Sequence, residues 1–129
     1  MSQARASALV VDDDPVSRQI VIRTLAQNGF ACNTASDGAE ARQCLAAADY
    51  RLVVTDLQMP NGNGHSLCVE LLEKTPRPVI VVLTGITEPR LANDLLARGV
   101  ERVLFKPIDC AQLAEVVQET IAKTAAASS

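Results

Sequence analysis

Polar residues suited to metal and phosphate chemistry end four of the five short apolar runs in this chain of 129 residues. The first run ends at Asp12 and Asp13, the third at Asp56 and the fourth at Thr84, and the fifth reaches Lys106. Grouped carboxylates raise one another's pKa unless a cation lies among them, and oxygen ligands without histidine or cysteine favour a hard ion such as Mg²⁺. A carboxylate is also a nucleophile toward phosphorus. These residue types predict a Mg²⁺-dependent phosphoryl acceptor, with Asp56 as nucleophile and with Lys106 and the Thr84 hydroxyl neutralising charge.

Such chemistry requires that residues far apart in the sequence meet at one edge of a sheet. The apolar runs predict strands at Ala8–Val11, Ala31–Ala35, Arg51–Thr55, Val79–Leu83 and Arg102–Phe105. Helices are expected at Pro15–Gln27, from beyond Ala35 to about Ala48, and at Gly64–Lys74, Glu88–Arg98 and Asp109–Lys123. Regular alternation with short loops predicts an α/β fold with a parallel sheet, right-handed crossovers and helices on both faces. Ligands of such sheets bind beyond the carboxyl ends of the strands, where the polar residues lie.

Capping residues agree with these boundaries. Helix starts are indicated at three places and helix stops at two: Asp14-Pro15, Thr87-Glu88-Pro89 and Asp109 with Gln112, then Gly29 and Gly99. Asp14 is therefore interpreted as a helix cap and is left out of the metal site.

The length of the chain and its 48% content of hydrophobic residues are enough to close one core. The segment Thr124–Ser129 contains only Ala, Ser and Thr, which predicts a frayed helix end. We therefore expect one domain over residues 1–124, with residues 125–129 as a disordered tail or the start of a linker.

Charge and cysteine content exclude several classes of partner. A net charge of −3 and a pI near 5.1 argue against direct binding to nucleic acid or to an anionic membrane. The four cysteines form no C-x-x-C pair and are interpreted as reduced residues that fill space: Cys32, Cys44, Cys68 and Cys110. With no leader segment and no apolar run long enough to span a bilayer, we expect a cytoplasmic location.

Four short motifs, in this order and spacing, resemble the receiver domains of two-component response regulators. They are LVVDDDP at Leu9–Pro15, VVTDLQMP at Val53–Pro60 with Gly64 following, VLTG at Val82–Gly85, and FKP at Phe105–Pro107. The resemblance spans nearly the whole chain. It implies a flavodoxin-like, doubly wound sheet of five parallel strands in the order 2-1-3-4-5, as in chemotaxis regulators.

The resemblance also assigns roles to the polar residues. It implies that Asp56 takes a phosphoryl group from a histidine kinase or a histidine phosphotransfer protein. Asp13, Asp56 and the backbone carbonyl of Gln58 would bind Mg²⁺, and Asp12 would act through water or supporting contacts. Lys106, followed by a cis bond to proline, would contact the phosphoryl group.

On activation, the family pattern implies that the Thr84 hydroxyl moves to the phosphoryl group and alters a partner-binding face. The partners implied are the phosphodonor, an unknown downstream effector and a second copy in a phosphorylation-linked homodimer. Family members commonly carry Tyr or Phe three positions before the lysine, where this chain has Val103. We therefore expect the change to stay in the loop after Thr84 and in the helix starting near Glu88.

The loop after the third predicted strand also departs from the family pattern. The loop after Pro60 carries Gly62 and Asn63 in place of the usual Met and Asp, which predicts a looser loop. The lone histidine, His65, is interpreted as a surface residue rather than a ligand or phosphoryl acceptor.

Three other functions were weighed against a receiver. A small aspartyl-phosphate phosphatase also uses an Asp nucleophile, but the usual D-x-D after the first strand is missing and a cap domain does not fit in this length. A phosphate-independent interaction module would not need the polar residues at the strand ends. A flavin site is weaker still, because no Ser/Thr/Gly-rich loop follows the first strand. We expect a signalling domain that assists its own phosphorylation and dephosphorylation, and not an enzyme acting on a separate substrate.

Overall fold

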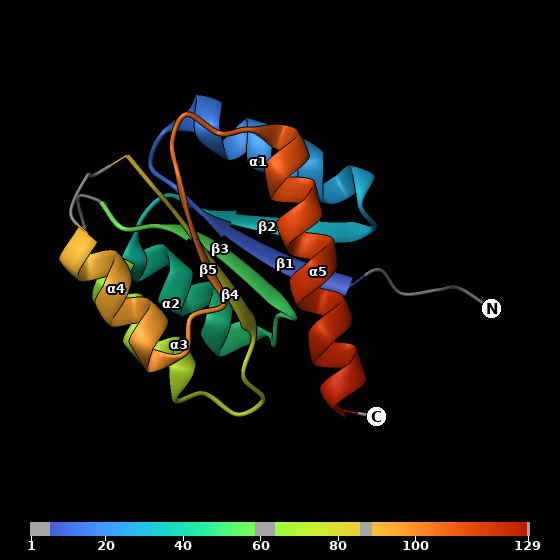
Figure 1. The fold of residues 1–129 in the computed structure, drawn as a ribbon. Helices are drawn as coiled ribbons and strands as arrows, with labels where there is room; N and C mark the ends of the chain where they lie inside the picture. Colours follow the sequence, from blue (N-terminus) through green and yellow to red (C-terminus); the bar gives the residue numbers. More distant parts are fainter. Residues whose placement is uncertain (1–5, 59–63, 86–88, 129) are drawn as a thin grey trace.

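The computed structural model describes residues 6–58, 64–85 and 89–128. Its strands form one parallel sheet in the order β2-β1-β3-β4-β5 (Figure 1). They are β1 (Ala6–Val11), β2 (Phe30–Ala35), β3 (Leu52–Asp56), β4 (Val79–Thr84) and β5 (Arg102–Phe105). The order and the parallel pairing confirm the predicted doubly wound fold.

Helices cover both faces of the sheet. They are α1 (Pro15–Gln27), α2 (Gly38–Ala47), α3 (Gly64–Leu72), α4 (Pro89–Arg98) and α5 (Cys110–Ser128). One face is covered by α1 and α5, and the opposite face by α2, α3 and α4 (Figure 1). Leu25 and Leu113 pack in the first layer, whereas Leu67 and Leu95 pack in the second.

The central strands are buried on both sides. All residues of β3 and of β4 are buried, because helices cover each face of the sheet at these strands. In the register of the sheet, Asp56 lies beside Leu83, and Thr84 lies beside Phe105. The carboxyl ends of β3, β4 and β5 are therefore aligned at one rim.

The helix boundaries follow from capping groups. Asp14 caps α1, since its carboxylate accepts a hydrogen bond from the Val16 amide at 3.1 Å, which confirms its interpretation as a cap. Asp37 caps α2 through the Glu40 amide at 2.8 Å, a cap that the sequence analysis did not identify. Gly29 and Gly99 stop α1 and α4 with φ values of 89° and 117°, in the left-handed region that glycine reaches without strain.

The ends of several elements differ from the prediction. α3 ends at Leu72, two residues earlier than expected, and β1 begins at Ala6, two residues earlier. The prediction that the last helix ends near Lys123 is wrong, because α5 continues to Ser128. The alanines of this segment have the highest helix propensity of any residue, which favours continuation of the helix. The loop at Gly62 and Asn63 and the helix start at Thr87-Glu88 lie outside the described residues.

The cysteines are all free, as predicted. Cys68 is buried and Cys32 and Cys44 are half-buried, which fits their interpretation as filling residues, but Cys110 is exposed. Among the described helices, none combines the length and the apolar character needed to cross a bilayer.

Candidate functional site

Three carboxylates meet at the carboxyl ends of β1 and β3. Asp12 and Asp13 follow β1 directly, and Asp56 is the last residue of β3, which pairs with β1. One carboxylate oxygen of each lies within 4.8 Å of the other two. Asp12 and Asp56 are buried, whereas Asp13 is exposed. The sequence therefore predicted correctly that these side chains converge.

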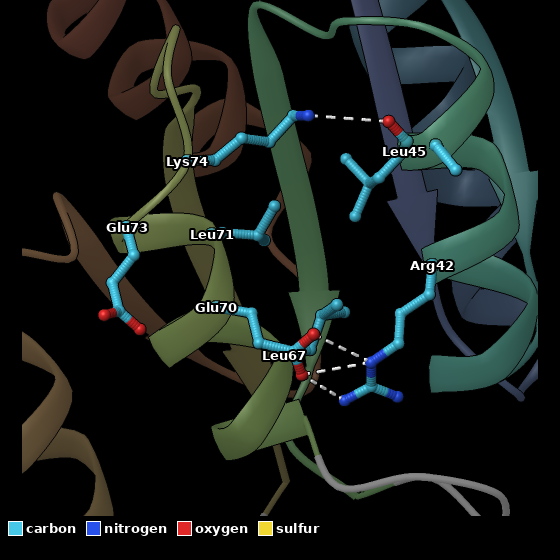
Figure 2. Close-up of a pocket in the computed structure, with 8 residues that line it drawn as sticks. Arg42, Leu45, Leu67, Glu70, Leu71, Glu73 and Lys74 are labelled. Atoms are coloured by element: carbon cyan, nitrogen blue, oxygen red, sulfur yellow. Dashed lines mark hydrogen bonds and ion pairs between the residues drawn. The ribbon is translucent and has the colours of Figure 1, made fainter.

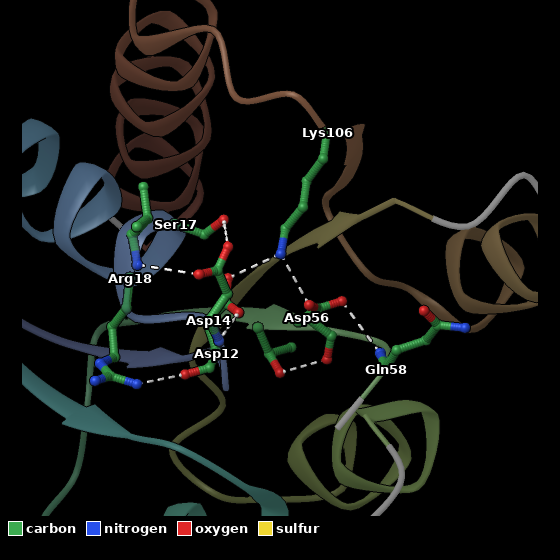
Figure 3. Close-up of polar contacts among 9 residues, drawn as sticks. Asp12, Asp14, Ser17, Arg18, Asp56, Gln58 and Lys106 are labelled. Carbon is green, nitrogen blue, oxygen red and sulfur yellow. Dashed lines mark hydrogen bonds and ion pairs between the residues drawn. The ribbon is translucent and has the colours of Figure 1, made fainter. Parts of the chain in front are cut away.

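Lys106 lies between the two buried carboxylates. Its Nζ donates to Asp56 Oδ2 at 2.9 Å and to Asp12 Oδ2 at 3.1 Å (Figure 3). Burial opposes the charged form of Lys106, but the hydrogen bonds and charges of Asp56 and Asp12 outweigh it and raise the lysine's pKa. The side chain is thus a fixed cation at neutral pH.

The backbone of Lys106 is anchored as well. Its amide donates to the Thr84 carbonyl at 2.8 Å, and the bond to Pro107 is cis, as the family resemblance implied. These contacts place the lysine directly after β5 and beside the end of β4. Thr84 itself is buried, with an exposed fraction of 1%.

Both carboxylate oxygens and the backbone amide of Asp12 form hydrogen bonds. Its Oδ1 accepts from the Asp14 amide at 2.9 Å, its Oδ2 accepts from Lys106, and its own amide donates to the Ala35 carbonyl at 3.0 Å. Burial raises the pKa of Asp12, and the hydrogen bonds from Asp14 and Lys106 offset only part of this rise. A cation added beside Asp12 would favour its ionised form.

The second oxygen of Asp56 is bound by the chain that follows it. The Gln58 amide donates to Asp56 Oδ1 at 3.1 Å, while the Gln58 side chain is exposed (Figure 3). Gly64 then returns the chain to the strand end, where its amide donates to the Leu57 carbonyl at 3.2 Å. A Cβ at Gly64 would lie 2.2 Å from the Asp56 carbonyl oxygen, so no side chain fits at this position.

Two residues of the region were not singled out from the sequence. Arg18 of α1 donates from Nη1 to the carbonyl oxygen of Asp12 at 2.9 Å. Gly64 was cited only as part of a motif, and the backbone contact that requires it could not be read from residue types. An arginine one turn into the first helix was the available signal for the Arg18 contact, but arginines on helices are mostly solvated.

His65 differs from its prediction as a surface residue. Its side chain is half-buried, and its Nε2 lies 2.7 Å from Asp94 Oδ2 on α4. The same oxygen accepts from Arg98 Nε at 2.8 Å. The His65 hydrogen bond, followed by that of Arg98, lowers the pKa of Asp94. His65 is thus a link between α3 and α4 and lies outside the carboxylate cluster.

A groove of about 390 Å³ between α2 and α3 shares no residue with the carboxylate cluster (Figure 2). Leu45, Leu67 and Leu71 provide its apolar lining. At one edge, Arg42 Nε donates to both carboxylate oxygens of Glu70 at 3.0 Å. The charges of this edge are already paired, so the groove offers no chemistry comparable to that of the rim.

The donor set at the rim fits a hard divalent cation. The described residues there provide carboxylate oxygens without a thiolate or imidazole, and Mg²⁺ prefers such ligands. Lys106 already compensates part of the negative charge, and the exposed Asp13 leaves one side of the cluster open. The cluster can therefore hold a metal ion.

Comparisons with known proteins agree with this site. The family model described as "Response regulator receiver domain" matches residues 8–118. The response regulator protein PilR of Pseudomonas aeruginosa is 31% identical over 114 residues, which are 88% of this chain and 26% of that protein. The sensor histidine kinase RcsC of Escherichia coli K12 is 32% identical over 117 residues, 88% of this chain and 12% of the kinase. The chain thus spans about a quarter or less of the length of these two relatives.

A solved structure shows the same fold. The chemotaxis response regulator CheY4 of Vibrio cholerae superposes with a TM-score of 0.81 at 28% identity, covering 91% of this chain and 99% of that one. The match of the family model covers most of the chain, including all three carboxylates and the lysine. The chain therefore belongs to the response regulator receiver domains, the signalling modules of two-component systems.

Proposed function

We propose that Asp56 accepts a phosphoryl group, with Mg²⁺ as cofactor, and that this modification switches the domain between two states. The observation that carries the proposal is the position of Asp56 at the end of β3, with Lys106 Nζ 2.9 Å from one carboxylate oxygen and two further carboxylates beside it. Of these three carboxylates, Asp56 ends a central strand of the sheet, whereas the other two lie in the turn after β1.

Asp12, Asp13 and Asp56, together with the Gln58 carbonyl, would hold the cation. When bound, Mg²⁺ would neutralise the carboxylates and the oxygens of an incoming phosphoryl group. The metal-binding role of each of these residues is part of the proposal. The exposed Asp13 is the carboxylate best placed to rearrange around an ion, because the other two are fixed by hydrogen bonds.

The phosphodonor would be a phosphohistidine on a histidine kinase or a histidine phosphotransfer protein. A carboxylate oxygen of Asp56 would attack phosphorus, the phosphorus–nitrogen bond would break, and the leaving imidazole would keep the electron pair and take up a proton. Lys106 would stabilise the negative charge that spreads over the phosphoryl oxygens during transfer. The product is an acyl phosphate on Asp56, which water can later cleave.

Switching would begin at Thr84, a buried hydroxyl at the end of the strand next to β3. A hydrogen bond from this hydroxyl to the phosphoryl group exists only in the modified state, so it favours one arrangement of the following loop and of α4. The downstream effector would read that rearrangement, or a second copy of the domain would pair through it. We also propose that the domain acts in the cytoplasm and does not itself bind nucleic acid or membrane. Its boundary would lie near residue 124.

Phosphoryl uptake from a small acyl phosphate tests the proposal against the two alternatives. Intact mass should rise by one phosphoryl group in the presence of Mg²⁺ and not in EDTA, while a small phosphate ester should not be turned over. Continuous turnover of the ester would instead indicate a phosphatase. No uptake from the acyl phosphate or from a phosphorylated histidine protein would indicate a phosphate-independent interaction module.

A further inference from the structure

The peptide between Asp12 and Asp13 is held by a side chain from the next helix. Arg18 donates from Nη1 to the Asp12 carbonyl oxygen at 2.9 Å (Figure 3). Arg18 is half-buried and belongs to α1, which packs on the sheet through Val21 and Leu25. A charged donor on a fixed helix therefore sets the orientation of this peptide.

Asp13 depends on that peptide more than its neighbours do. The Asp12 carboxylate accepts from Lys106 and from the Asp14 amide, and the Asp56 carboxylate accepts from Lys106 and from the Gln58 amide. Within the part of the chain that the structure describes, no group donates a hydrogen bond to the carboxylate of Asp13, and this residue is exposed. The direction of its side chain is therefore set mainly by the backbone from which it projects.

We propose that Arg18 is a positioning residue for the metal site, acting through the Asp12 carbonyl to aim the Asp13 carboxylate at the cation. This inference rests on the proposed function of the rim. The guanidinium reaches backbone, not a carboxylate, so its effect on the site is geometric. Residues that orient metal ligands in this indirect way typically change metal affinity by about 10–100-fold when they are replaced.

The sign of the effect separates positioning from simple charge. A positive charge near a cation site repels the cation, so removing Arg18 would tighten Mg²⁺ binding if only its charge mattered. A positioning role predicts the opposite, because the loss of the hydrogen bond lets the Asp13 backbone reorient. Arg23 supplies a matched control, since it is an exposed arginine on the same helix.

The experiment compares Mg²⁺ affinity, by calorimetry or amide shifts, in the full chain and in Arg18→Gln, Arg18→Lys and Arg23→Gln. We expect Arg18→Gln to bind Mg²⁺ about tenfold more weakly than wild type. Arg23→Gln should bind as wild type or slightly more tightly. Arg18→Lys, which keeps the charge and one flexible donor, should recover part of the loss. Phosphoryl uptake by Arg18→Gln from a small acyl phosphate should approach the wild-type rate when Mg²⁺ is saturating, because the loss lies in metal affinity.

Equal or tighter Mg²⁺ binding by Arg18→Gln, matching Arg23→Gln, would overturn the inference. If Arg18→Gln does not fold, Arg18→Met decides, because it keeps the aliphatic stem but has no donor: wild-type or tighter Mg²⁺ affinity in that variant overturns a positioning role, and a clear loss supports it. Failure of the proposed function itself would look different, because wild type would then bind no Mg²⁺ or take up no phosphoryl group.

Discussion

Lys106 donates to one oxygen of Asp12 and to one oxygen of Asp56, and backbone amides occupy the other oxygen of each. The two buried carboxylates are therefore held in position before any ligand binds. Asp13 differs because it is exposed. We therefore expect a different role for each acid: Asp56 would react, Asp13 would complete the metal site and Asp12 would support both.

Replacing Asp13 should weaken the metal site without harming the fold. In Asp13→Ala, Mg²⁺ affinity should fall at least about tenfold, because too few hard anionic ligands remain to replace the water shell of the ion. Asp14→Ala is the control: it removes a neighbouring acid whose carboxylate caps α1, so it should lower the unfolding midpoint and leave Mg²⁺ affinity nearly unchanged. Calorimetric titration of both variants measures this, and unchanged affinity in Asp13→Ala would move the metal elsewhere.

The ionised carboxylate of Asp12 should lower the free energy of unfolding at neutral pH when Mg²⁺ is absent. Its pKa in the folded state is raised by burial, so its ionised form is less favourable in the fold than in the unfolded chain. That cost is absent below the unfolded-state pKa of about 3.9, grows as the pH rises through the folded-state pKa and is complete at neutral pH. Asp12→Asn should therefore raise the free energy of unfolding at pH 7.

Urea unfolding in EDTA at pH 7 and pH 4 measures this difference between wild type and Asp12→Asn. The gap should shrink at pH 4, where Asp12 is protonated in a larger fraction of folded molecules. A less stable variant at pH 7 would show that the contacts to Lys106 and the Asp14 amide outweigh burial.

The connection from β3 to α3 depends on close approach of two backbone segments. Gly64 begins α3 and donates its amide to the Leu57 carbonyl. A Cβ at this position would lie 2.2 Å from the Asp56 carbonyl oxygen and 2.7 Å from the Leu57 Cα, and both are backbone atoms that cannot rotate away. The start of α3 is thus fixed against the residue proposed to be phosphorylated.

Gly64→Ala should destabilise the domain by about 2–3 kcal/mol, because the added methyl group forces the helix start away from the strand end. Gly85→Ala is a matched control, since a Cβ at Gly85 would come no closer than 4.0 Å to the Lys106 Cβ. Chemical denaturation of both variants checks the difference. Equal stability of Gly64→Ala and wild type would mean that the start of α3 can move away from the end of β3 without lowering the free energy of unfolding.

α4 is linked both to α3 and to β5, the strand that follows it. His65 and Arg98 both bind Asp94, and Val103 of β5 packs in the same core layer as Leu95 of α4. Valine has no ring that could swing between buried and exposed positions, and Phe105, the nearby aromatic, is 52% exposed. We therefore expect the switch to act through displacement of α4.

Amide shifts should locate the switch. On addition of beryllofluoride and Mg²⁺, which mimic the phosphoryl group and its cofactor, large changes should concentrate in residues 84–98. A partner would then recognise the position of α4, and a ring rotamer would play no part. Equally large changes centred on Val103 and extending into residues 109–117 would show that β5 switches without its aromatic residue.

For the whole molecule, the sequence predicted best those features that depend on a run of apolar residues and on the polar residue that ends it. The alternating apolar runs predicted all five strands within two residues at each end, and the polar residues after them converge as expected. The order of the strands came from the family resemblance, because periodicity does not say which strands are neighbours.

Contacts that depend on long side chains or on backbone approach were not predictable. The reach of Arg18 to the Asp12 carbonyl, the pairing of His65 with Asp94 and the contact at Gly64 each require the relative positions of two elements. The predicted end of α5 was wrong for another reason, since a run of alanines is compatible both with a frayed end and with a continued helix.

Mapping the phosphorylated residue would show directly whether Asp56 is the acceptor. The full chain would be treated with a small acyl phosphate and Mg²⁺, reduced with borohydride, and digested for mass spectrometry. We expect an aspartyl phosphate at Asp56 to be converted to homoserine at that position alone, and Asp56→Asn to take up no stable phosphoryl group. Homoserine at Asp12 or Asp13, or uptake by Asp56→Asn at a rate near that of wild type, would contradict it.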